Sequence, residues 1–236
     1  VCAADFYIPE GRKAPRKVRR VGRECIEAIF EFSLSVGKGA GIVRLTEAKN
    51  GDLLAWHIST TLQEIDGHAE KIGENRPTGA AYSRNFGGDN WDDARKKAVA
   101  YDGREPTVLV IGGAQAGLSI AARLNQLGID TLVVESWPRI GDSWRKRYHS
   151  LALHNSIHLN HLPYMEFPPT WPKYIPKDML GLWFEFYAEA MEINCWTDTE
   201  FVSGEWNADE RSWTAKLKSG DGTERVVRPQ IGRAHV

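Results

Sequence analysis

A glycine-rich run in the middle of the chain has the residue types that bind a phosphate group. The run consists of Gly112, Gly113, Ala114, Gln115, Ala116 and Gly117. An apolar run at 108–111 precedes it, as is typical of a buried parallel strand, and an apolar helix pattern follows it. A helix that begins there directs unpaired N–H groups and the positive end of its dipole at the turn. The sequence therefore predicts a pyrophosphate-binding turn.

The positions of this run and the acid after it have separate roles. Gly112 suits the tight turn, and Gly117 suits the point where helix and strand pack closely. The middle position is Ala114, whose methyl group would face the pyrophosphate and weaken binding by on the order of 1–3 kcal/mol. Glu135 ends the next predicted strand, 131–134, where a carboxylate binds ribose hydroxyls and disfavours a 2′-phosphate. This β-α-β unit predicts a dinucleotide site for FAD or NAD rather than NADP.

The segment after Glu135 resembles class B flavoprotein monooxygenases, a group that includes flavin-containing monooxygenases, Baeyer–Villiger enzymes and plant YUCCA proteins. Residues 139–148 resemble the Gly-Gly-x-Trp region of that family, although Asp142 replaces its second glycine. The Leu-His-Asn stretch at 153–155 and the helix that ends with Phe-Tyr-Ala at 186–188 are also similar. The resemblance is nearest to fungal and bacterial members with an additional N-terminal domain.

The resemblance covers about 105–230 and implies the FAD-binding part of an NADPH-dependent monooxygenase. In this family NADPH reduces the flavin, dioxygen adds to it, and the flavin hydroperoxide oxygenates a small organic substrate. The flavin supplies the chemistry, so no acid–base pair is required, and the catalytic residues stay unassigned. Beyond the turn and Glu135, the implied cofactor-binding residues are Ser136, Gly141, Asp142, Trp144, Arg145, Tyr148, His154 and Asn155.

The ends of the sequence indicate a fragment. A second glycine-rich turn for NADPH and the Phe-x-Gly-x-x-x-His run of the family are missing, and we expect both beyond about residue 230 of a longer parent. The chain starts with Val1, not Met. Residues 231–236 fit no strand or helix pattern and resemble a translated sequencing adapter. We therefore expect truncation at both ends and a non-native tail at 231–236.

Residues 1–66 are predicted to form an antiparallel sheet with one face in water. Alternation puts the even-numbered residues from Ile26 to Val36 on one face and Glu27 on the other. The glycine run 37–41 is expected to form a turn, and Asn50-Gly51 predicts a hairpin. The following strand has a second apolar face, formed by Leu54, Trp56, Ile58, Thr60 and Leu62. This stretch resembles part of a SnoaL-like domain, an antiparallel α+β fold.

The remaining elements complete an α/β fold class. Residues 67–104 have linker composition, with a short helix predicted from Trp91 to Ala100 and Asn90 as its N-cap. Residues 105–230 are expected to form an incomplete Rossmann-like FAD-binding domain. Within it, Asp178 can cap a helix, and strands at 213–217 and 223–227 are expected to form a hairpin.

Composition excludes several classes of protein. The 236 residues carry a net charge of −1, which argues against bulk binding of nucleic acid. The three cysteines have no short spacing, so we expect no disulfide scaffold or zinc ribbon and a reducing, cytoplasmic compartment. No apolar run is long enough to span a membrane. The histidines between 149 and 161 lack a carboxylate or cysteine partner, so no metal site is predicted, and the basic run 12–20 is expected to form a solvated loop.

The expected partners are a small-molecule substrate and dioxygen, without nucleic acid or membrane, and the oligomeric state stays open. One alternative is an NAD-dependent dehydrogenase of the single-Rossmann type. It would have further β-α-β units after residue 140, where the sequence has a loop rich in Pro and Trp. Another alternative is a non-catalytic module that binds a small ligand in its N-terminal sheet. A flavin disulfide reductase would need a close cysteine pair after the first helix of the unit, and the sequence has none.

Overall fold

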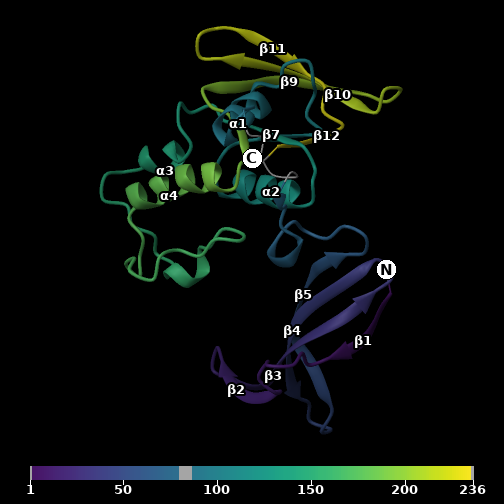
Figure 1. The fold of residues 1–236 in the computed structure, drawn as a ribbon. Helices are drawn as coiled ribbons and strands as arrows, with labels where there is room; N and C mark the ends of the chain where they lie inside the picture. The colour runs from purple at the N-terminus through teal and green to yellow at the C-terminus, as the bar shows by residue number, and fades with distance from the viewer. Residues whose placement is uncertain (1, 80–86, 235–236) are drawn as a thin grey trace. The chain divides into compact units, whose positions relative to one another are not determined.

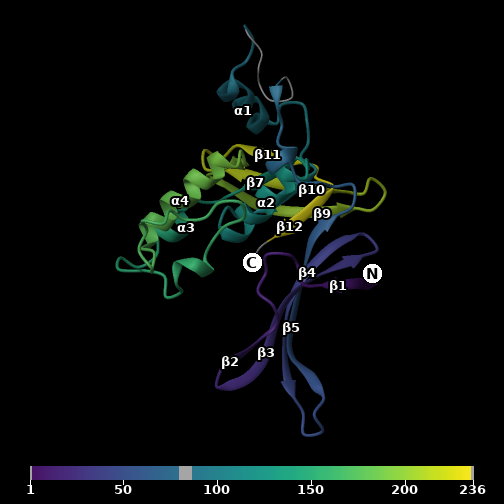
Figure 2. The same ribbon diagram turned by 60° about the horizontal axis from the view of Figure 1, so that its bottom comes forward.

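The computed structural model describes residues 2–79 and 87–234, and the chain divides into two compact units, Val1–Ala69 and Glu70–Val236. The first unit is an antiparallel sheet in the order β1-β3-β4-β5, with β2 paired to β3 (Figure 2). Its strands are β1 (Ala3–Tyr7), β2 (Arg16–Arg20), β3 (Arg23–Leu34), β4 (Gly37–Glu47) and β5 (Leu53–Ile65). No helix lies among the described residues of this unit, and its resemblance to a SnoaL-like domain stays a prediction.

The expectation of a turn at the glycine run of the first unit is wrong, because of residues across the sheet. The glycine run 37–41 is not a turn but the start of β4. Gly41 lies opposite Phe30 and Gly39 opposite Phe32, and a Cβ atom at either glycine would lie within 2.6 Å of the facing ring. The glycines therefore make room for aromatic rings that cover the strand. The predicted hairpin at Asn50-Gly51 is confirmed, with a positive φ of 87° at Gly51.

Residues 16–20 of the basic run form the strand β2 rather than a loop, whereas 12–15 belong to no helix or strand. Arginines from β2 and β4 explain why Glu27 is buried rather than in water. Arg20 binds both carboxylate oxygens of Glu27, at 2.7 and 3.0 Å, and Arg44 donates to it from β4 at 2.9 Å. A buried carboxylate needs such partners. By contrast, every residue of β5, an edge strand, is exposed, including the apolar set from Leu54 to Leu62.

The second unit is built around a parallel sheet in the order β12-β6-β7-β8. The elements along this unit are α1 (Trp91–Ala100), β6 (Val108–Ile111), α2 (Gln115–Gln126), β7 (Thr131–Val134), α3 (Asp142–Arg145), α4 (Lys177–Ala190), β8 (Asn194–Trp196), β9 (Thr199–Asn207), β10 (Ser212–Ser219), β11 (Glu224–Val227) and β12 (Ile231–Ala234). Two short 3₁₀ helices lie at Gly73–Asn75 and Ile157–Leu159. The fold is α/β with a Rossmann-type β6-α2-β7 unit, as predicted.

Both faces of the parallel sheet are covered, which explains why its strands are apolar without alternation. On one face, Val110 and Val133 pack with residues of α2 and α4. On the other face, Leu109 and Leu132 pack against the antiparallel β9-β10-β11 sheet. Figure 1 shows these three layers, with β9 to β11 above the parallel sheet and α2 and α4 below it.

Several local predictions for this unit are confirmed. The helix Trp91–Ala100 has Asn90 as its N-cap, in a capping box with Asp93. The bounds of β6 and β7 are as predicted, and β10 pairs with β11 as a hairpin. Asp178, however, is not the N-cap of α4: that position is Pro176, and Asp178 lies inside the first turn, where it accepts a hydrogen bond from Lys177.

The expectation that 231–236 fit no strand is wrong for 231–234, which form β12 in parallel register with β6. Main-chain groups make this pairing, and both Gln230 and Ile231 donate to the carbonyl of Thr107. Such pairing requires little of the side chains. Residues 235–236 lie outside the described residues.

The sequence-based reason for disfavouring a single-Rossmann dehydrogenase holds only in part: 146–176 form a long loop, as expected, but α4 and β8 then complete a second β-α-β unit that shares β7. The chain passes from β7 through α4 to β8, which is parallel to β7. Among the described residues, no helix has both the length and the apolar character to cross a membrane.

Candidate dinucleotide site

The glycine-rich turn joins the end of β6 to the start of α2. Gly112 has φ +100°, a conformation that favours glycine, and Ala114 is the N-cap of α2 in an extended conformation. A Cβ atom at Gly117 would lie 1.8 Å from the carbonyl oxygen of Gly112, so helix and strand pack there without room for a side chain. Ala114 gives no side-chain cap. The first N–H groups of α2 therefore have no side-chain cap or helical partner, as in an anion-binding turn.

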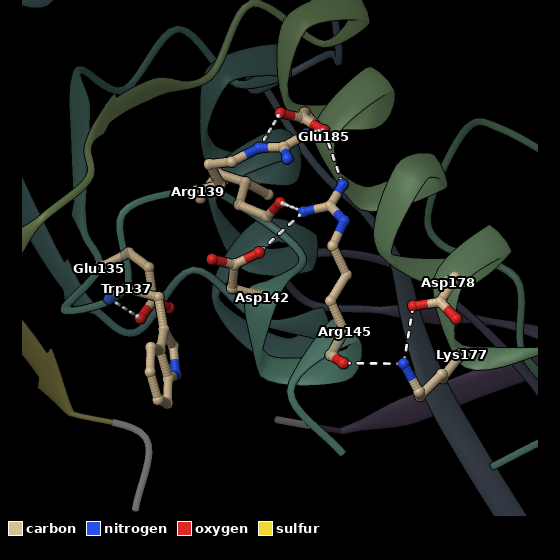
Figure 3. A network of polar contacts seen from close by, with 9 residues as sticks. Glu135, Trp137, Arg139, Asp142, Arg145, Lys177, Asp178 and Glu185 are labelled. Atoms are coloured by element: carbon tan, nitrogen blue, oxygen red, sulfur yellow. Dashed lines mark hydrogen bonds and ion pairs between the residues drawn. The ribbon is translucent and has the colours of Figure 1, made fainter. Parts of the chain in front are cut away.

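Glu135 is buried at the end of β7 and faces this turn. Its Oε2 atom accepts the main-chain N–H of Gly113 at 2.7 Å, and its Oε1 atom accepts that of Trp137 at 2.9 Å, the second bond being drawn in Figure 3. The hydroxyl of Ser136 donates to Oε1 at 3.2 Å. A Cβ atom at Gly113 would lie 2.6 Å from the side chain of Ile140. These contacts fix the carboxylate beside the turn.

A cavity of about 410 Å³ opens beside the N-terminal turn of α2. Five predicted site residues line it: Gln115, Ala116, Trp144, His154 and Asn155. Sequence reasoning did not identify its other lining residues, which are Ser119, Leu153, Leu159, Asn160, His161, Leu162, Leu180 and Phe184. Most of these are apolar, and their helix or loop patterns indicate only core packing. The mainly apolar lining with a few polar groups is typical of a cofactor pocket.

Among the described residues, three buried side-chain polar atoms have no hydrogen-bond partner: the hydroxyl of Ser143 and the indole N–H groups of Trp144 and Trp183. Of these three residues, Trp144 lines the cavity. Leaving such a group unpaired costs about 1–3 kcal/mol. The ring of Trp144 packs edge-on against Phe184, with 6.5 Å between the centroids. An unpaired donor in the cavity wall, together with the open turn and Glu135, fits a dinucleotide with many acceptor oxygens.

The short helix α3, which carries Trp144, is docked against α4. A Cβ atom at Gly141 would lie 2.2 Å from the carbonyl oxygen of Gly181, so the two segments touch through their main chains. The guanidinium of Arg145 donates to the carbonyl of Ile140 at 2.8 Å, to Asp142 at 3.1 Å and to Glu185 at 2.6 Å. Figure 3 shows the contacts with Asp142 and Glu185. The Lys177 ammonium donates to the carbonyl of Arg145 at 2.8 Å.

The predicted residues thus fall into separate groups. The turn and Glu135 lie together, and the cavity wall contains Gln115 and Ala116 of the turn as well as Trp144, His154 and Asn155. Gly141, Asp142 and Arg145 take part in docking α3 against α4. Tyr148 is 68% exposed and is not among the residues that line the cavity.

Two residues away from the turn have shifted pKa values. Burial raises the pKa of the Cys195 thiol to about 12, so this cysteine is a poor nucleophile. The hydrogen bond from Arg139 lowers the pKa of Glu185, which is therefore ionised at neutral pH. Across the described ranges 2–79 and 87–234, no group of His, Cys, Asp and Glu side chains could hold a metal ion.

Comparison with known proteins gives relatives for part of the chain, although no protein-family model matches it. The chain is 29% identical over 116 residues to the probable indole-3-pyruvate monooxygenase YUCCA4 of Arabidopsis thaliana, an alignment that covers 49% of this chain and 28% of that protein. It is 38% identical over 96 residues to an uncharacterized CzcO-like oxidoreductase of Geobacillus kaustophilus, with 41% of this chain and 28% of that protein covered. The chain therefore spans little more than a quarter of the length of these relatives.

A solved structure supports the fold. The bacillithiol disulfide reductase Bdr (YpdA) from Bacillus cereus matches with a TM-score of 0.52 and 14% sequence identity, covering 56% of this chain and 39% of that chain. At this identity the match concerns the fold alone. The chain is thus similar in sequence to a monooxygenase and an oxidoreductase, and similar in fold to a redox enzyme of the Rossmann type.

Proposed function

We propose that the second unit binds FAD as part of an NADPH-dependent flavoprotein monooxygenase that oxygenates a small organic substrate with dioxygen. The observation that carries the proposal is the contact of Glu135 with the Gly113 amide at the open turn of β6-α2-β7, next to the cavity. The sequence similarity to a monooxygenase and an oxidoreductase supports the class of reaction.

In this proposal each part of the site has one task. The N–H groups at the start of α2 bind the pyrophosphate, where the helix dipole favours negative charge. Glu135 accepts hydrogen bonds from the adenosine ribose. Trp144, His154 and Asn155 line the part of the cavity that would hold the flavin ring, and they exclude water from it. Bound FAD, once reduced by NADPH, would supply the activation of dioxygen, so no acid–base pair of the chain is required.

The proposal extends to the NADPH site and to the cellular compartment. A second glycine-rich turn for NADPH is expected to follow residue 230 in a longer parent protein, and the chain described here would then bind FAD without completing a catalytic cycle. All three cysteines are free, which supports a reducing compartment such as the cytoplasm.

A titration of the purified chain tests the proposal. We expect a flavin spectrum on purification or, after addition of FAD, saturable quenching of flavin fluorescence. NAD is titrated in parallel, because binding of NAD without FAD would favour the dehydrogenase alternative. A folded, colourless protein that ignores both nucleotides would contradict the dinucleotide site. The matched control is Gly117→Val, which closes the turn and should abolish binding while the first unit keeps its sheet.

A further inference from the structure

We propose that Glu185 is a positioning residue of the FAD site: it fixes α3 through Arg145 and thereby holds Trp144 in the wall of the cavity. This inference rests on the proposed function, since it concerns how the same site is kept in shape. Glu185 does not itself line the cavity, and its contact with Arg145 connects it to α3.

Glu185 lies at the centre of a two-arginine contact on α4 (Figure 3). Its Oε2 atom accepts Nη2 of Arg145 at 2.6 Å and Nη2 of Arg139 at 2.8 Å, and its Oε1 atom accepts Nε of Arg139 at 3.1 Å. The Arg145 side chain is 19% exposed, whereas that of Arg139 is 58% exposed. A charge-assisted hydrogen bond is weakened less by solvent where its donor is shielded from water, as at Arg145.

The Arg145 guanidinium connects Glu185 to both ends of α3. It donates to the carbonyl of Ile140, just before the helix, and to the carboxylate of Asp142, its first residue. Arg145 is itself the last residue of α3. A helix of four residues is not stable by itself, so its position depends on such outside contacts.

Close packing holds α3 against α4, in addition to the contacts of Arg145. Gly141 and Gly181 touch through their main chains, and a Cβ atom at Gly181 would lie 2.8 Å from Cγ of Arg145. The Trp144 ring rests on Phe184, the residue next to Glu185 on α4. Loss of the Glu185 charge therefore frees α3 to move outward, and Trp144 moves with it out of the cavity wall.

The test compares the contacts that Glu185 makes with Arg145 and with Arg139. We expect Glu185→Gln and Arg145→Gln each to raise the Kd for FAD about tenfold. Arg139→Gln is the control. It removes the more exposed ion pair of the same carboxylate and should change the Kd for FAD less than about twofold. The double variant Glu185→Gln/Arg145→Gln should bind FAD no more weakly than the weaker single variant, because both changes break one contact.

Hydrogen exchange separates this inference from the proposed function. In the chain without added nucleotide, we expect Glu185→Gln to speed amide exchange at 142–145 at least about tenfold, with α2 unaffected. That result stands even if the wild type binds no FAD, in which case only the proposed function fails. Unchanged exchange and unchanged Kd in Glu185→Gln, or an equal loss in Arg139→Gln, would overturn the positioning role. If Glu185→Gln does not fold, Arg145→Lys is measured in the same way, because lysine keeps the charge but lacks the planar guanidinium group. Wild-type exchange and a wild-type Kd in Arg145→Lys would also overturn the positioning role.

Discussion

The carboxylate of Glu135 accepts the main-chain N–H of Gly113 at 2.7 Å, which joins the end of one parallel strand to the turn that follows its neighbour. The carboxylate also accepts the N–H of Trp137, so its two oxygen atoms are oriented before any nucleotide arrives. Such preorganisation lowers the cost of ordering the site on binding.

We expect Glu135→Gln to weaken both the fold and the site. The neutral amide is a poorer acceptor for two main-chain donors, and a hydrogen bond to a charged group contributes about 1.5–3 kcal/mol. The free energy of unfolding should fall by about 1–2 kcal/mol, and the Kd for FAD should rise at least about tenfold. Chemical denaturation and fluorescence titration measure the two effects. Glu200→Gln, at an exposed position of β9, should change neither. An unaltered Kd in Glu135→Gln would remove this residue from the site.

In Gly117→Ala, the higher helix propensity of alanine opposes a steric clash of the added methyl group. Alanine in a helix is favoured over glycine by about 1 kcal/mol. The added methyl would lie 1.8 Å from the Gly112 carbonyl oxygen, and an overpacked contact of this kind costs about 1–3 kcal/mol or more. We expect the clash to win, so that the variant is less stable by more than about 1 kcal/mol and loses FAD binding. A thermal shift upward would show that helix and strand have room to separate.

Ala114→Gly tests the middle position of the turn in the opposite direction. Removing the methyl opens the approach to the main chain, and glycine is a better N-cap than alanine. We expect tighter FAD binding, by up to about tenfold, without loss of stability. Isothermal titration measures the change. Weaker binding in this variant would mean that the pyrophosphate does not pass over residue 114.

The parts of the site that lie within one β-α-β unit could be predicted from the sequence. Gly112, Gly117 and Glu135 follow from strand and helix periodicity together with one acid, and no distant residue is needed to place them. The other wall of the cavity could not be predicted, because Leu180 and Phe184 reach it from α4. One signal was available: Gly181, inside a helix pattern, marks the close approach of another segment.

The errors in the fold have a common cause, which is that partners distant in sequence decide the local structure. Gly39 and Gly41 suggest a turn until the aromatic rings opposite them are known. The alternation predicts that Glu27 lies on an exposed face, and only the positions of Arg20 and Arg44 explain its burial. The strands β1, β2, β9 and β12 were not predicted, because an edge strand is stabilised by main-chain pairing that a variety of side chains permits.

The first unit should lose stability in acid through Glu27. Hydrogen bonds from Arg20 and then Arg44 lower the pKa of Glu27 from 4.5 to about 2. A lowered pKa in the folded state stabilises the fold above about pH 4.5, and this contribution disappears as pH falls through about 2. We expect the stability difference between wild type and Glu27→Gln to be constant above pH 5 and to shrink steadily below pH 4.5. Urea unfolding across this range, followed by a signal from the first unit, measures it. A difference that does not depend on pH would show that the arginines do not bind this carboxylate.

The last prediction concerns β12, which pairs with β6 in the core sheet. Gly232 lies in this strand, and a Cβ atom there would lie 3.5 Å from the ring of Trp213, an ordinary contact. It also borders an apolar cavity of about 140 Å³, so a methyl group has room and a surface to cover. We expect Gly232→Ala to raise the free energy of unfolding by about 0.5–1 kcal/mol. The control is Gly222→Ala in the β10–β11 turn, where φ is +88° and alanine should destabilise by about 1 kcal/mol or more. If Gly232→Ala has no effect while Gly222→Ala destabilises, 231–234 do not form a strand of this sheet in solution.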